Sequence, residues 1–345
     1  MSAAVRSLSA SLAASAVFPF QYDAMTEQVM MVALPAVAIN KAAFLDQRVL
    51  SEARGSSTAT IQDFEAAAEA LPARSPNLIF HQGHCGSTLI SRLVATSTST
   101  RALREPLVLR SLATLWSSVS AGDSTVSPAV FKRRLDLFLR CFASGAPPAI
   151  LKASSICTDL ADMALATDPD VRALFLFVQP DVYITTMLAG PSNRIDLSAF
   201  GGLRRQRLRN RGVETEPLHT LSPGRLAALA WLCEAVAFCS APSDGRFSLM
   251  DFDRFLADPA SSLQNAARHL GLAVDPAAAR AAVDGPDMRT YSKAQQHEYS
   301  PSLRADVLAQ ARIDYAAEID AGLGWLASRA ARNSMVQDVI KTLSA

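Results

Sequence analysis

A strand, a glycine turn and a helix follow one another near residue 80, and this succession constrains the fold more than any other feature. The turn and its flanks read Phe80, His81, Gln82, Gly83, His84, Cys85, Gly86, Ser87, Thr88, Leu89. The first N–H groups of a helix have no partner within it, and the helix dipole adds partial positive charge there. Gly83 and Gly86 let the backbone approach a ligand closely, so the turn predicts a phosphate or sulfate site.

The alternation of a short apolar strand with an amphipathic helix then repeats along the chain. Expected strands are Leu78–His81, Arg101–Arg104, Ala149–Lys152, Ala173–Val178 and Phe247–Met250. Expected helices are Ser87–Ser97, Leu107–Ser120, Pro128–Ala143, Asp181–Ala189, Pro223–Cys239, Pro259–Leu270 and a last one from Pro301 to about Ala321, interrupted by Gly322-Leu323-Gly324. Mostly apolar strands that alternate with helices indicate a parallel sheet covered on both faces. The prediction is an α/β fold with a doubly wound parallel sheet of about five strands flanked by helices.

Composition limits the classes of protein that fit. The chain has 345 residues, half of them hydrophobic, and a formal net charge of +1, which argues against broad nucleic-acid binding. No apolar run is long enough to cross a bilayer, and five cysteines without a CxxC pair favour a reducing, cytoplasmic setting without disulfides or zinc.

Residues 1–75 are expected to precede the core, with a strand at Val29–Leu34, a helix near Ile61–Leu71 and a frayed start over Met1–Val17. Residues 76–345 are expected to form the α/β domain with a helical C-terminal part.

Two strand ends carry charged residues that suit proton and anion chemistry. Glu105 follows the second strand, and Lys152 ends the third. The carboxyl ends of parallel strands share one edge of the sheet, where such sheets bind their ligands. Glu105 can take a proton there from a hydroxyl or amine, or it can merely pair with Arg104 or a nearby helix N-terminus. Lys152 is expected to reach an anion or, as a surface side chain, solvent.

Taken together, these motifs resemble those of the sulfotransferase family over about residues 76–330. The family's 5′-phosphosulfate loop carries Arg or Lys, then Ser, Gly, two hydroxyl residues and Leu or Trp; the residues here are His84, Cys85, Gly86, Ser87, Thr88 and Leu89. Glu105-Pro106 is similar to members in which this Glu is the base, and Lys152 is similar to the Lys that assists the leaving phosphate. Ser154 stands where cytosolic members have a catalytic His.

Less of the family's 3′-phosphate site is present. Thr186 matches the family's Ser in spacing, whereas Val178 replaces its Arg. Arg289, Tyr291, Ser292 and Lys293 resemble the C-terminal basic loop that covers adenosine and the 3′-phosphate, although Tyr291 could equally be a core residue. A second basic group, Arg204, Arg205, Arg207, Arg209 and Arg211, is expected in a loop, as a solvated mobile lid, as a partner surface or on the phosphate.

The resemblance implies transfer of a sulfuryl group from 3′-phosphoadenosine-5′-phosphosulfate (PAPS), without a metal, to a hydroxyl or amine of a small molecule or glycan. The product nucleotide would be adenosine 3′,5′-bisphosphate. It implies Glu105, Lys152 and His84 as catalytic residues. It implies donor binding by Gly83, Cys85, Gly86, Ser87, Thr88, Leu89, Thr186, Arg289, Tyr291, Ser292 and Lys293. Two alternatives stay open: a metal-dependent phosphotransferase on the same scaffold, and an inactive relative that binds a nucleotide or anion.

Overall fold

A five-stranded parallel sheet forms the centre of the molecule. The computed structural model describes residues 2–240, 244–291 and 298–344. The strands are β4 (Asn77–His81), β5 (Arg101–Arg104), β6 (Ala149–Lys152), β7 (Ala173–Phe177) and β8 (Phe247–Asp251), in the order β5-β6-β4-β7-β8. Every neighbouring pair is parallel. The predicted doubly wound parallel sheet is confirmed, with strand bounds that differ by at most one residue at either end.

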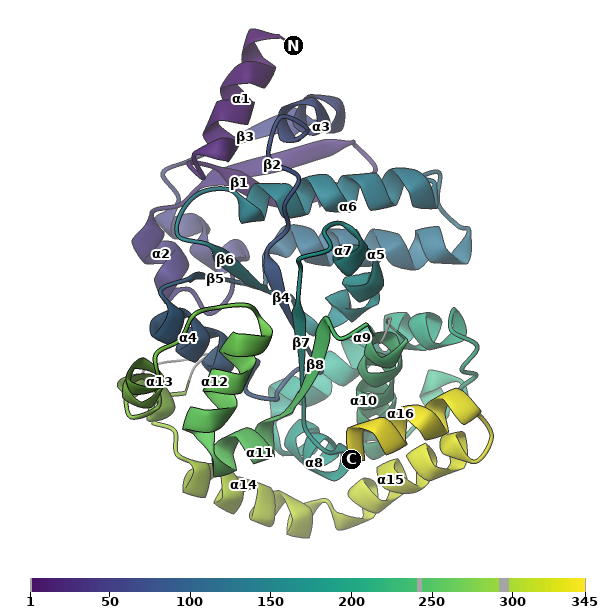
Figure 1. Ribbon diagram of the computed structural model, residues 1–345. Coiled ribbons are helices and arrows are strands. Elements are labelled where there is room, and N and C mark those ends of the chain that lie inside the picture. Colours follow the sequence, from purple (N-terminus) through teal and green to yellow (C-terminus); the bar gives the residue numbers. More distant parts are fainter. Residues whose placement is uncertain (1, 241–243, 292–297, 345) are drawn as a thin grey trace.

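Helices cover both faces of this sheet (Figure 1). On one side lie α4 (Ser87–Thr98), α12 (Pro259–His269) and α13 (Pro276–Val283); on the other lie α5 (Leu107–Ala121), α9 (Pro191–Arg209) and α10 (Pro223–Cys239). The remaining segments are α6 (Pro128–Ala143), the 3₁₀ turn η2 (Ser155–Leu160), α7 (Ala161–Ala166), α8 (Pro180–Ala189), η3 (Leu218–Thr220), α11 (Phe252–Ala257) and η4 (Pro286–Met288). Pro128 and Pro223 occupy the first helical turn, as expected.

The N-terminal segment is more structured than predicted. Helix α1 (Ala3–Ala13) begins at Ser2, whose side chain accepts a hydrogen bond from Val5 N, so the expected frayed start was wrong. An antiparallel sheet follows, made of β1 (Phe18–Asp23), β2 (Gln28–Ala33) and β3 (Gly55–Thr60), and α2 (Ala36–Lys41), η1 (Gln47–Glu52) and α3 (Ile61–Ala68) complete it. β3 is polar and almost fully exposed, so its sequence shows no alternation of apolar and polar residues.

The C-terminal helices break at a different place from the one predicted. Helix α14 (Pro301–Asp314) ends at Tyr315, and α15 (Ala316–Ala330) continues through Gly322 and Gly324 before α16 (Ser334–Ser344). A Cβ on Gly322 would lie 2.6 Å from the carbonyl oxygen of Gly224 in α10. Gly322 therefore permits a close crossing of two helices and does not terminate one. No helix among the described residues combines the length and apolar character that a bilayer span requires.

Candidate functional site

The register of the parallel strands brings Glu105 beside Lys152. Arg104 in β5 is paired with Lys152 in β6, and the N–H of Glu105 donates to the carbonyl of Lys152 over 2.6 Å. Glu105 has a φ of +51°, a left-handed conformation that is costly for a non-glycine residue and recurs at functional sites. The chain thus turns sharply between β5 and α5 at the residue that carries the carboxylate.

Four polar side chains surround the Glu105 carboxylate. The Lys152 ammonium contacts Oε1, and the Ser154 hydroxyl donates to Oε2 over 3.1 Å. His81 Nε2 lies 3.7 Å from Oε1, and Arg110 Nη2 lies 3.8 Å from Oε2. Lys152 is 0% exposed and Glu105 8% exposed. Donors and cations at these distances stabilise the ionised form of a carboxylate.

This geometry excludes two of the interpretations that the sequence left open for the pair. Arg104 donates to the carbonyl oxygens of Asn40 and Ala42, at 3.1 and 2.7 Å, and to Ser91. It is therefore committed to other groups and does not pair with Glu105. The surface position considered for Lys152 was wrong, because this side chain is fully buried in the strand end.

The glycine turn ends at the N-terminus of α4. Gly86 is the N-cap residue, with a φ of +71° and without a capping side chain, so the first N–H groups of α4 receive no side-chain cap. A Cβ at Gly86 would lie 2.0 Å from the ring of Phe252, so no larger residue fits there. Thr88 is 3% exposed, and its buried Oγ1 has no hydrogen-bond partner among the described residues. A buried hydroxyl without a partner is costly unless a ligand completes it.

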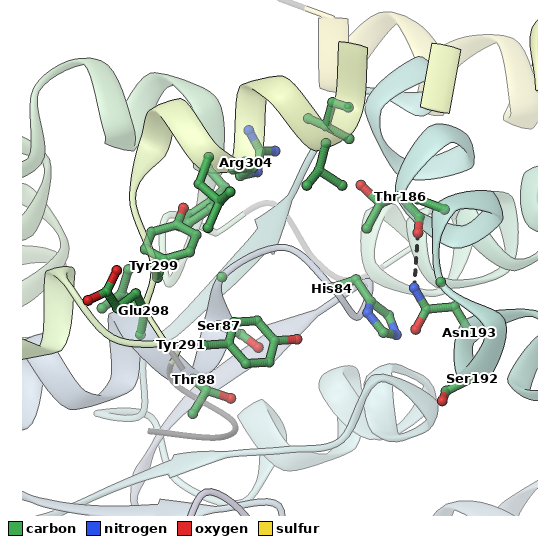
Figure 2. A pocket seen from close by; sticks show the side chains of 18 of the residues that line it. His84, Ser87, Thr88, Thr186, Ser192, Asn193, Tyr291, Glu298, Tyr299 and Arg304 are labelled. Carbon is green, nitrogen blue, oxygen red and sulfur yellow. Dashed lines mark hydrogen bonds between the residues drawn. The ribbon is translucent and has the colours of Figure 1, made fainter. Parts of the chain in front are cut away.

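A cavity of about 540 Å³ opens in front of this helix N-terminus (Figure 2). Ser87, Thr88, His84 and Tyr291 lie around it, and Thr186 is on the opposite wall. We call this cavity the larger pocket; it is lined by His84, Gly86, Ser87, Thr88, Leu89, Thr186, Ala189, Gly190, Pro191, Ser192, Asn193, Phe252, Tyr291, Glu298, Tyr299, Leu303, Arg304, Val307 and Leu308. Its volume lies within the range of about 300–1,000 Å³ that is usual for small-molecule sites.

A second cavity, of about 190 Å³, contains the Glu105 carboxylate. We call it the smaller pocket; its walls include Phe44, His81, Gln82, Gly83, His84, Glu105, Arg110, Ser154, Ser155, Ile156, Tyr183, Phe200 and Leu203. Phe44 comes from the N-terminal segment, where Leu45 exchanges backbone hydrogen bonds with Arg104 and Leu107 at 2.7 and 3.0 Å. His84, with a φ of +52°, lines both pockets. The two pockets therefore meet at the glycine turn.

The residues expected around the donor nucleotide are only partly gathered. Thr186 and Tyr291 line the larger pocket, and Tyr291 is 43% exposed, so it is no core residue. Arg289 does not line that pocket and donates to the carbonyl of Asp284 over 2.7 Å. Ser292 and Lys293 lie outside the described residues. Cys85 is buried, with its Sγ directed to the carbonyl of Leu176, 3.2 Å away, so only its backbone can face an anion.

The arginines expected in a loop belong instead to helix α9 and the turn after it, so the prediction of a loop was wrong. Arg207 is buried and bonds both Asp159 and Glu234 through four hydrogen bonds of 2.7–3.0 Å. Arg204 is paired with Asp196 at 2.6 Å. Both guanidinium groups are paired with carboxylates, and they line the cavity of about 190 Å³ that contains Glu105 and not the cavity in front of α4.

Three residues of the smaller pocket were not identified from the sequence. His81 was expected to be a core or rim side chain, and its position one residue before the turn was the only available signal. Arg110 lies on the first turn of α5, five residues after Glu105, where a helix places side chains near its N-terminus. Phe44 carries no sequence signal, because only the docking of the N-terminal segment brings it to the site. Among the described residues, no group of three or more His, Cys, Asp or Glu side chains is placed to hold a metal ion.

Comparisons with known proteins give distant structural neighbours. No protein-family model matches the chain, and no curated protein matches its sequence. A sulfotransferase domain from the curacin biosynthetic pathway is 16% identical, with a TM-score of 0.42, over 79% of this chain and 98% of its own. A sulfotransferase from Mycobacterium avium is 13% identical, with a TM-score of 0.38, over 72% of this chain and 78% of its own.

A third structure, a sulfotransferase from Alicyclobacillus acidocaldarius, is 14% identical, with a TM-score of 0.35, over 72% of this chain and 95% of its own. All three belong to the family that the sequence motifs resemble. At this distance the likeness does not define a reaction, for which the residues of the two pockets are the relevant observations.

Proposed function

We propose that this protein is a sulfotransferase that moves a sulfuryl group from PAPS to a hydroxyl or amine. The observation that supports this most directly is the buried pair of Glu105 and Lys152 beside the glycine turn. A carboxylate at the mouth of one pocket and an uncapped helix N-terminus at the mouth of the next are the two groups that such a transfer needs.

In this proposal the larger pocket takes the donor. The first N–H groups of α4, together with the hydroxyls of Ser87 and Thr88, would hold the 5′-phosphosulfate, because they combine hydrogen-bond donors with the positive end of the helix dipole. The partnerless Thr88 Oγ1 supplies a donor that no described residue uses. Tyr291 and Phe252 offer aromatic faces for adenine, and Thr186 lines the opposite wall.

The proposed reaction balances without a further reagent. The acceptor oxygen or nitrogen forms a bond to sulfur, while the bond from sulfur to the bridging oxygen of the 5′-phosphate breaks and leaves its electron pair on that oxygen. The acceptor proton passes to Glu105. Lys152 and His84 would stabilise the charge that develops on the departing oxygen, and adenosine 3′,5′-bisphosphate leaves as the product.

We propose that the acceptor enters the smaller pocket. Glu105 lines this pocket, so a hydroxyl or amine bound here would lie beside the base. A cavity of about 150 Å³ is enough to hold one benzene ring, so about 190 Å³ admits a single ring or a terminal sugar of a larger acceptor. Phe44 and Phe200 provide aromatic walls for such a ring.

We also propose that the protein works in the cytoplasm. All five cysteines are free thiols, and four of them are buried. Burial raises the pKa of the Cys157 thiol to about 12, so this side chain is a packing residue without thiolate reactivity. Free buried thiols fit a reducing compartment.

The decisive experiment measures turnover and nucleotide binding in a variant in which Glu105 is replaced. Glu105→Gln keeps the shape of the side chain but cannot accept a proton, so we expect turnover with PAPS to fall by at least about 10²-fold. Calorimetry with adenosine 3′,5′-bisphosphate should show micromolar binding in both proteins. Glu69→Gln, the same change at an exposed side chain, is the matched control and should leave both measurements unchanged.

Three results would count against the proposal. Near wild-type turnover in Glu105→Gln would remove Glu105 from the mechanism. Absence of binding to the bisphosphate, together with Mg²⁺-dependent consumption of ATP, would favour a phosphotransferase. Binding of the bisphosphate with no turnover on phenols, alcohols, amines or sugars would favour the inactive relative.

A further inference from the structure

The side chain of His81 lies between the glycine turn and the Glu105 carboxylate, with one ring nitrogen near each. It is the last residue of β4, it is 4% exposed, and it lines the smaller pocket. Its Nδ1 accepts a hydrogen bond from the N–H of Gly83 over 2.9 Å, and its Nε2 lies 3.7 Å from Glu105 Oε1. One ring therefore accepts a bond from a backbone amide of the turn and lies beside the carboxylate.

The hydrogen bond from Gly83 sets the protonation of this ring. A nitrogen that accepts a hydrogen bond carries no proton, so Nδ1 is bare and a neutral ring must carry its proton on Nε2. The Nε2–H group then points toward Glu105 as a donor. The strand end that holds the ring is rigid, since the neighbouring Gln82 accepts bonds from Val178 N and the Tyr183 hydroxyl, each over 3.3 Å.

Lys152 has two tasks in the proposed function, and they compete. In the structure its ammonium contacts Glu105 Oε1. During transfer it must also meet the charge that develops on the departing oxygen. When Lys152 turns toward the donor, Oε1 loses its nearest donor, and His81 Nε2 lies 3.7 Å from the same oxygen. This distance is longer than a hydrogen bond, but catalytic hydrogen bonds commonly shorten once substrate is bound.

We propose that His81 is a positioning residue: its Nε2–H holds the Glu105 carboxylate in place while Lys152 engages the donor, and its Nδ1 orders the turn. This inference rests on the proposed sulfuryl transfer. In this inference Nε2 acts on the acceptor side, at Glu105, and Nδ1 acts on the donor side, at the glycine turn. Each task can be removed without the other.

Two substitutions remove the tasks one at a time. Asn places its amide near the position of Nδ1 and can still accept from Gly83, but it has no group at Nε2; Gln places an NH₂ donor near Nε2 and loses the acceptor at Nδ1. For His81→Asn we expect kcat to fall on the order of 10- to 100-fold, the usual effect of losing a hydrogen bond to a charged group, with little change in the Kd of adenosine 3′,5′-bisphosphate. For His81→Gln we expect kcat within a few-fold of wild type and a weaker Kd. Circular dichroism and thermal melts establish that both variants are folded.

Every other pattern overturns the inference. Equal losses in the two folded variants would mean that His81 only packs, wild-type values in both would mean that it has no task, and the reverse pattern would exchange the roles of its nitrogens. If the wild-type protein itself transfers no sulfuryl group, the proposed function fails first. Nitrogen-15 NMR of labelled histidines tests the ring independently of activity, because a proton on Nδ1 at pH 7 would contradict the assigned tautomer.

Discussion

The Arg207 cluster and the Glu105 cluster both place ionised side chains in the interior beside the smaller pocket. In the Arg207 cluster, one guanidinium is shared by two carboxylates, Asp159 and Glu234, and Arg211 adds a second cation 3.1 Å from Asp159. Cations and carboxylates are equal in number. In the Glu105 cluster, one carboxylate faces Lys152 and Arg110, with His81 close by, so cations are in excess.

The two clusters differ in charge balance, and we propose that the balanced one is structural and the one with excess cations is reactive. Burial alone would lower the pKa of Arg207, but Asp159 and Glu234 raise it well above its ordinary value, so the arginine stays charged and fully bonded. The Glu105 cluster keeps a cationic surplus at the edge of a pocket. A surplus of this kind is neutralised when an anionic group arrives, which is the condition expected where a sulfuryl group passes.

The most direct test of this comparison is to remove Arg207 from the Arg207 cluster. Arg207→Leu leaves Glu234 buried without this partner and leaves Asp159 with Arg211 alone, and we expect a loss of about 3–5 kcal/mol in the free energy of unfolding. Urea denaturation measures it. Arg209→Leu, the same change at an exposed position of α9, should change the free energy of unfolding by no more than about 0.5 kcal/mol. A loss as small as that of the control would show that the cluster is not a structural element.

Removing Lys152 from the Glu105 cluster should affect the rate of turnover more than the stability of the fold. For Lys152→Met we expect kcat to fall by about 10²–10³, because a preorganised cation at the departing oxygen is lost. The free energy of unfolding should fall less than in Arg207→Leu, since Glu105 keeps Ser154 and Arg110 and reaches the pocket. Steady-state kinetics and urea denaturation are measured together, with Lys132→Met on exposed helix surface as control. The reverse ranking of the two losses would make Lys152 a structural residue.

The smallest effect is expected in the response of stability to acid. Burial alone would raise the pKa of Asp159, but Arg207 and Arg211 hold it below its ordinary value. The unfolded chain therefore binds more protons than the folded one in the window from the ordinary pKa of about 4 downward, and stability falls as the pH falls through that window. Asp159→Asn should flatten the slope of unfolding free energy against pH by up to about 1.4 kcal/mol per pH unit. An unchanged slope would show that Asp159 is not the titrating group.

Local signals were sufficient wherever the chain's own neighbours decide its structure. The helix starts at Pro128 and Pro223, the five strands and the glycine turn were predicted within one residue, because caps, prolines and apolar runs act over a few positions. Glu105 and Lys152 were also identified, since the residue at or just after the end of a parallel strand lies at the ligand edge of the sheet. The arginines near residue 207 were misread as a loop, because charge density gives no information about which carboxylates a helix will meet.

By itself the sequence determined the order of strands and helices, the glycine turn before α4, and the two charged residues at neighbouring strand ends, all of which depend on short-range periodicity and backbone chemistry. Only the tertiary structure decided what those residues touch. The strand register placed Lys152 on Glu105, the β4 end turned His81 toward the same carboxylate, and the docking of the N-terminal segment brought in Phe44. These contacts join residues that lie 24 to 62 positions apart, from His81–Glu105 to Leu45–Leu107. They depend on how the apolar faces of whole elements pack, which no local pattern encodes.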